Sequence, residues 1–92
     1  MQLALDLLAR PTPENLLQAR GLLDQAVALQ RRIDPEHPGL DDMLLACGKV
    51  ARAQGDHERA RRGLDEALGR LRRHHGGKDS RTVEARAALA SL

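Results

Sequence analysis

The sequence contains no phenylalanine, tyrosine or tryptophan, so its core must be built from aliphatic side chains. β-Branched residues are also scarce, whereas leucine, alanine, arginine, glutamate and glutamine, which are strong helix formers, are abundant. This composition predicts an all-α protein. With 92 residues, the chain is expected to form one domain or a fragment of one.

Further absences narrow the class of protein. The single cysteine, Cys47, excludes an internal disulfide framework and fits a reducing compartment, so we expect a cytoplasmic location. No apolar run reaches the roughly 18 residues that a membrane span needs. Residues 1–10 contain Asp6 and lack the basic start of a signal peptide. The formal net charge is only +2, which gives no large basic field. Heavy use of Ala, Arg, Gly and Leu suggests a bacterial, GC-rich genome.

Proline and glycine divide the chain into five amphipathic segments. Within the segments, apolar residues recur at helical spacing, and the breaks fall at proline and glycine turns. The predicted helices cover residues 1–10, 13–33, 40–54, 57–75 and 81–91. The predicted N-caps are Thr12, Asp56 and either Asp79 or Ser80. The connections are only about three to six residues long, so neighbouring helices should be antiparallel.

Each helix has a predicted apolar side. In residues 13–33 the inward stripe is expected to contain Leu16, Ala19, Leu23, Ala26 and Ile33, with Leu22 and Leu29 beside it. In residues 81–91 the corresponding side is expected to contain Val83, Ala87 and Leu89.

An eight-residue pattern occurs twice, 41 residues apart. Residues 19–26 and 60–67 both read Ala-Arg-x-x-Leu-Asp-(Gln/Glu)-Ala. Self-similarity at a period of this length is typical of stacked helical repeats. A closed bundle of four or five helices is the alternative architecture, but it does not explain the repeated pattern.

The central part of the chain resembles the tetratricopeptide repeat family. Small and large residues alternate there at the family's positions, namely Leu44, Gly48, Gly55-Asp56, Ala60, Leu64 and Ala67. The repeat period is about 41–42 residues instead of the common 34. Together with the turn at 34–38, which contains His37-Pro38, this period is similar to the longer repeats of the kinesin light chain type. The later turn at 77–80 lacks the His-Pro pair, and Leu7 stands where the first unit should have a small residue.

The resemblance implies antiparallel helix hairpins stacked as a right-handed superhelix of about two and a half repeats. The single domain 1–92 would then divide into units 1–36 and 37–77 and a half unit 78–92. Such repeats are non-catalytic scaffolds that grip a peptide or a partner helix in a concave groove. Carried over position by position, the groove would contain Ala4, Leu8, Asp42, Leu45, Lys49, Arg52, Ala53, Glu84 and Ala87.

Two basic residues predict that the groove prefers an acidic partner. Lys49 and Arg52 lie three residues apart on one helical side, where they could hold a carboxylate of an acidic protein or peptide partner. Otherwise they are solvated surface charges. We expect neither a cofactor nor a catalytic residue. The chaperone-binding clamp of some family members is not reproduced, so capture of a C-terminal carboxylate is not implied.

Other kinds of chemistry have weaker support in the sequence. The four histidines lack the spacing of metal ligands, and Cys47 lies on an apolar stripe, where a buried structural thiol is expected. Arginines in residues 57–75 could touch nucleic acid. However, acidic residues interrupt them, and no aromatic residue is present to stack on a base.

The two ends of the chain are apolar, unlike the polar caps of complete repeat arrays. We therefore expect either a segment of a longer array or a protomer that buries an end against a second copy. The alternative function is accordingly structural: oligomerisation, or a spacer within a larger regulatory protein.

Overall fold

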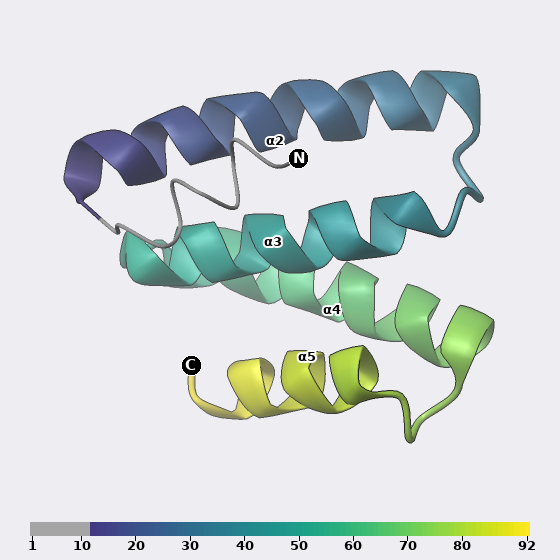
Figure 1. The fold of residues 1–92 in the computed structure, drawn as a ribbon. Coiled ribbons are helices and arrows are strands. Elements are labelled where there is room, and N and C mark those ends of the chain that lie inside the picture. The colour runs from purple at the N-terminus through teal and green to yellow at the C-terminus, as the bar shows by residue number, and fades with distance from the viewer. Residues whose placement is uncertain (1–11) are drawn as a thin grey trace.

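The computed structural model describes residues 12–92, which form four α-helices (Figure 1). These are α2 (Pro13–Ile33), α3 (Gly39–Ala53), α4 (His57–His75) and α5 (Ser80–Ala90). All four helices expected in this range are confirmed, and each predicted boundary lies within one residue of the observed one. The helix predicted for residues 1–10 lies outside the described residues.

Side chains cap three of the helices at their N-termini. The Thr12 hydroxyl accepts a hydrogen bond from the Asn15 N–H at 3.1 Å, and the Asp56 carboxylate accepts one from the Arg59 N–H at 3.2 Å. The Asp79 carboxylate accepts from the Arg81 N–H at 2.9 Å, and this bond is the main reason that the pKa of Asp79 is lowered. The predicted caps are confirmed, with Asp79 rather than Ser80 as the cap of α5.

A glycine turn joins α3 to α4. Gly55 has φ of 78°, a left-handed conformation that glycine adopts without a steric penalty. The N–H of Asp56 bonds the Ala51 carbonyl and that of Gly55 bonds the Arg52 carbonyl. This is the Schellman arrangement, which satisfies the last carbonyls of a helix. The same two residues thus end α3 and begin α4, so the two helices fold back against each other.

Successive helices run antiparallel, in the order in which they occur in the chain (Figure 1). α3 packs between α2 and α4, and α5 packs against α4. Each helix therefore contacts mainly its neighbours in sequence. This is the arrangement of helix hairpins that the short connections predicted.

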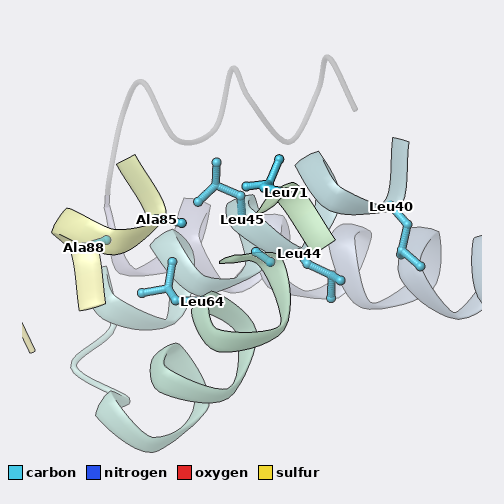
Figure 2. Packing of buried hydrophobic residues seen from close by; sticks show 8 residues of the cluster. Leu40, Leu44, Leu45, Leu64, Leu71, Ala85 and Ala88 are labelled. Carbon is cyan, nitrogen blue, oxygen red and sulfur yellow. The ribbon is translucent and has the colours of Figure 1, made fainter. Parts of the chain in front are cut away.

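The core is aliphatic and divides into two clusters. The larger cluster joins α3, α4 and α5, and Figure 2 shows where its side chains lie on these helices; its buried members are Leu40, Leu44, Leu45, Leu64, Ala67, Leu71, Ala85 and Ala88. The smaller cluster joins α2 to α3 through Leu16, Ala19, Leu23, Ala46 and Val50, with Cys47 beside them.

Small residues allow α3 and α4 to approach closely. A Cβ atom added to Gly48 would lie 2.6 Å from Cγ of Leu64, and one added to Gly63 would lie 3.3 Å from the Gly48 backbone. Ala60 is completely buried. Gly48 is therefore a position of close contact between α3 and α4.

Two of the predicted apolar sides need correction. Val83 is 49% exposed, whereas α5 buries Thr82, Ala85 and Ala88. Burial of Thr82 is feasible because its hydroxyl donates to the Gly76 carbonyl at 2.9 Å. On α2, Leu29 and Ile33 are 55% and 69% exposed, because among the described helices α2 packs mainly against α3 and buries only a narrow stripe.

None of the helices between residues 12 and 92 is both long enough and apolar enough to cross a bilayer.

Candidate functional site

Four of the predicted groove residues lie where α3 and α5 run past each other. Asp42, Lys49 and Arg52 are on α3, and Glu84 is on α5. We call this surface, defined by these four residues, the α3–α5 face. Ala53 and Ala87 are exposed on the same two helices. The predicted groove residues Ala4 and Leu8 lie outside the described part of the chain.

Polar contacts join the two helices along the α3–α5 face. Arg81 donates to the Asp42 carboxylate at 2.8 Å, Lys49 forms an ion pair with Glu84, and Arg52 donates to the Ser91 hydroxyl at 3.2 Å. The hydrogen bond to Asp42, followed by that to Asp79, raises the pKa of Arg81. On the α3–α5 face, Asp42, Lys49 and Glu84 are thus held in ion pairs, whereas Arg52 bonds only a neutral hydroxyl.

Leu45 differs from its expected role. It was predicted to lie in the groove, but it is only 5% exposed and belongs to the larger core cluster (Figure 2). The reason is that α3 is the central helix of the described arrangement, with neighbours on several sides, so it buries 8 of its 15 residues. Little of the Leu45 side chain is available to a partner in this structure.

The sequence did not predict a buried ionic cluster between α3 and α4. Asp41 is completely buried, and its carboxylate accepts a hydrogen bond from Nε of Arg70 at 2.6 Å. Nδ1 of His74 lies 2.7 Å from the other carboxylate oxygen, and Arg70 also donates to the His37 carbonyl at 3.3 Å. Each charged group in this cluster has a partner, as a buried charge requires.

The sequence contains only part of the signal for this cluster. Arg70 and His74 are four residues apart and therefore share one side of α4. Sequence spacing cannot place them opposite Asp41, because that requires the relative register of two helices. The cluster holds the start of α3 against the end of α4, which is a structural role.

In the described region, His37 and Cys47 lie in surroundings that give them local structural roles. Among residues 12–92, no group of three or more His, Cys, Asp or Glu side chains could hold a metal ion. His37 accepts a hydrogen bond from the Gly39 N–H at 2.9 Å, which stabilises the turn before α3. Burial raises the pKa of the Cys47 thiol to about 11, so at neutral pH it is a protonated, poorly nucleophilic group.

Half of the α4 arginines singled out in the sequence are held in ion pairs. Arg59 pairs with Asp24, Arg70 with Asp41 and Arg73 with Glu36. An arginine that is already neutralised contributes less to binding a phosphate backbone. This pairing weakens the case for nucleic-acid binding along α4.

Antiparallel hairpins that contact their neighbours in sequence, with small residues at the helix crossings, define a helical-repeat protein. A family model described as tetratricopeptide repeat matches residues 14–73, which include α3 and nearly all of α2 and α4. The chain belongs to the tetratricopeptide repeat family, whose repeats generally mediate protein–protein interactions. Comparison with curated proteins and with solved structures gives no match.

Proposed function

We propose that this chain is a non-catalytic interaction module that binds a peptide or a partner helix along the α3–α5 face. One observation supports this proposal most directly. Three α3 residues that were placed in the groove by family resemblance, Asp42, Lys49 and Arg52, all reach side chains of the α5 segment. α3 and α5 therefore form a continuous polar surface on which an extended or helical segment can lie.

The ion pairs on this face do not prevent binding. The Lys49 and Glu84 side chains are 36% and 46% exposed, and exposed pairs of this kind contribute only about 0.2–1 kcal/mol. An acidic group of a partner can therefore replace Glu84 beside Lys49 at small cost. Arg52 is exposed one helical turn further along and supplies a second cation. These two cations give the face its preference for an acidic partner.

The experiment begins with a random peptide library selected on the wild-type protein. Dissociation constants of the enriched peptides are then measured for the double variant Lys49→Glu/Arg52→Glu. The matched control is Arg61→Glu/Arg72→Glu, which makes the same change in net charge at exposed positions of α4. We expect acidic peptides whose affinity falls at least tenfold in the first variant and less than twofold in the control.

Circular dichroism must show that both double variants keep the helix content of the wild type. If the affinity of every enriched peptide is unchanged by Lys49→Glu/Arg52→Glu, the α3–α5 face is not the binding surface. Equal losses in the two double variants would indicate a general effect of charge and would also contradict the proposal.

The exposed side of α2 supports a second candidate function, oligomerisation. Leu17, Leu29 and Ile33 are 66%, 55% and 69% exposed there, so α2 offers three large apolar side chains to a second copy. Sedimentation across a dilution series tests this candidate. A mass that stays monomeric at high micromolar concentration, with full helicity, would exclude self-association through this helix.

We also propose that the repeats of this chain are of the longer, kinesin light chain type. These repeats would stack as a right-handed superhelix. The 41-residue spacing of the repeated pattern and the His37-Pro38 turn before α3 support this assignment. An experimental structure that includes residues 1–11 tests it, because the proposal requires a helix there that pairs with α2.

A further inference from the structure

A cleft opens between α2 and α4, on the side of α3 that lies opposite the α3–α5 face. Its volume is about 550 Å³, which is within the usual range for ligand sites. The floor comes from α3 through Leu44 and Cys47. These residues lie two positions from Asp42 and Lys49, so they point away from the α3–α5 face. The cleft is lined by Asp24, Val27, Ala28, Arg31, Leu44, Cys47, Arg59, Arg62, Gly63 and Glu66.

Two ion pairs cross the cleft and hold its walls together. Asp24 on α2 pairs with Arg59 on α4, and Arg31 on α2 donates to Glu66 on α4 at 2.8 Å. The hydrogen bond to Glu66 is the main reason that the pKa of Arg31 is raised. Both carboxylates of the lining are therefore neutralised by guanidinium groups of the same lining.

Arg62 is the charge that remains. Of the charged side chains that line the cleft, it alone has no hydrogen-bond or ion-pair partner among residues 12–92. It is exposed on α4, and the neighbouring Gly63 has no side chain to cover it. The lining as a whole has three arginines and two carboxylates, which leaves one positive charge to be matched by a ligand.

The interior of the cleft is apolar. Val27 and Ala28 line it from α2, Leu44 and Cys47 from α3, and Gly63 from α4. A single large apolar side chain fits such a space between helices, and a carboxylate on the same segment would then meet Arg62 at the rim. Carboxylate–guanidinium hydrogen bonds are both strong and directional.

We propose that this cleft is a second peptide-binding site, and that it takes an acidic segment of a protein partner. A large apolar side chain of the segment enters between α2 and α4, and an adjacent Asp or Glu pairs with Arg62. The site does not depend on the α3–α5 face, because the two surfaces lie on opposite sides of α3 and share no residue.

The test selects a random peptide library on the wild-type protein after depletion on Ala28→Trp. Ala28 is exposed, so a tryptophan there fills the cleft without entering the core. Gln25→Trp, also exposed on α2 but outside the lining, is the matched control for the added side chain. Arg62→Glu tests the role of the unpaired positive charge. Its control is Arg61→Glu, which makes the same change of charge at an adjacent exposed residue outside the lining.

We expect enriched peptides to combine a large apolar residue with Asp or Glu. Their dissociation constants should rise at least tenfold in Ala28→Trp and in Arg62→Glu, and less than twofold in Gln25→Trp and in Arg61→Glu. Cys47, the only cysteine, reports occupancy directly. At pH 9, a bound peptide should slow its alkylation by iodoacetamide severalfold.

Several outcomes would overturn this site. One is a selection that enriches no binding peptide, or only basic ones. Another is affinity that is unaffected by Ala28→Trp and by Arg62→Glu. Alkylation of Cys47 at an unchanged rate when the peptide is saturating would equally exclude the cleft. If the selection without depletion yields only peptides that lose affinity in Lys49→Glu/Arg52→Glu, the α3–α5 face is supported and the cleft is refuted, so the two proposals can fail separately.

Discussion

Two adjacent aspartates of α3 have opposite environments. Asp41 is completely buried against Arg70 and His74, whereas Asp42 is exposed and pairs with Arg81. Burial determines how much each aspartate contributes to the free energy of unfolding. An exposed pair gains little in water, but removal of one partner of a buried pair leaves an uncompensated charge.

Asp41→Ala should therefore lower the free energy of unfolding by about 3–5 kcal/mol, because Arg70 would stay buried without its carboxylate. Asp42→Ala, the matched control, should cost about 1 kcal/mol or less. Urea unfolding followed by circular dichroism measures both. Equal losses in the two variants would show that the buried cluster contributes no more than a surface pair.

Cys47 gives a prediction for pH dependence. Burial, followed by the charge of Asp24, raises the pKa of its thiol to about 11, and Arg59 and Arg31 oppose this shift. Since the thiolate is the reactive form, alkylation of the folded protein should accelerate about tenfold per pH unit from pH 7 to 10. In the urea-unfolded chain, the rate should level near pH 9.

The same shift affects stability with a defined sign. The folded state holds the thiol proton more tightly than the unfolded state. The stabilisation of the folded state by Cys47 is therefore fully present at a pH below the thiol pKa of the unfolded chain. It is lost as the pH rises toward about 11. Alkylation kinetics that level near pH 9 in the folded protein would contradict both the shift and its consequence.

At the scale of single residues, the sequence predicted local roles better than pairings. The caps Thr12 and Asp56 were predictable because each bonds a backbone group three residues away. The partnership of Asp41 with Arg70 was not, because 29 residues separate them and their meeting depends on how two helices align.

Among the helices, the crossing of α3 and α4 depends on Gly48. Gly48→Ala should destabilise the protein by about 1–3 kcal/mol, because the new Cβ would lie 2.6 Å from Leu64. Gly69→Ala is the control, since a Cβ there meets nothing within 4 Å. It should stabilise the protein by about 0.5–1 kcal/mol through helix propensity. Thermal unfolding distinguishes these opposite signs.

Helix boundaries were predicted well, and helix faces less well. Proline, glycine and capping residues determine where a helix begins and ends through local geometry. The buried side of α5 depends instead on its contact with α4. Val83 is exposed and Thr82 is buried there; burial of Thr82 is tolerated because its hydroxyl finds an acceptor in the turn before α5, which hydropathy alone does not reveal.

The shared location of the candidate residues was predictable, whereas their role in binding stays a prediction. The resemblance predicted Asp42, Lys49, Arg52 and Glu84 on one surface, and in the structure polar contacts to or from the α5 segment join them there. Leu45 was misplaced because position in a repeat does not say how fully the neighbouring helices cover it. The cleft between α2 and α4 was missed, because it arises from packing and not from a motif.

Considered as a whole, the described molecule is held together by contacts between neighbours in the chain. Such proteins unfold in parts more readily than a closed bundle does. Ala85→Asp should therefore release α5, because Ala85 is completely buried and an unpaired carboxylate there is costly. Hydrogen exchange should accelerate in α5 and much less in α2. Equal acceleration in both helices would indicate a single cooperative unit.

The aliphatic core has a practical consequence. With no tryptophan or tyrosine in the chain, the protein contributes almost nothing to near-ultraviolet absorbance or to intrinsic fluorescence. The emission of a partner that contains tryptophan can therefore be followed on a dark background. A partner indole that enters the space beside Leu44 and Val27 would leave water for hydrocarbon, and its emission would shift to shorter wavelength.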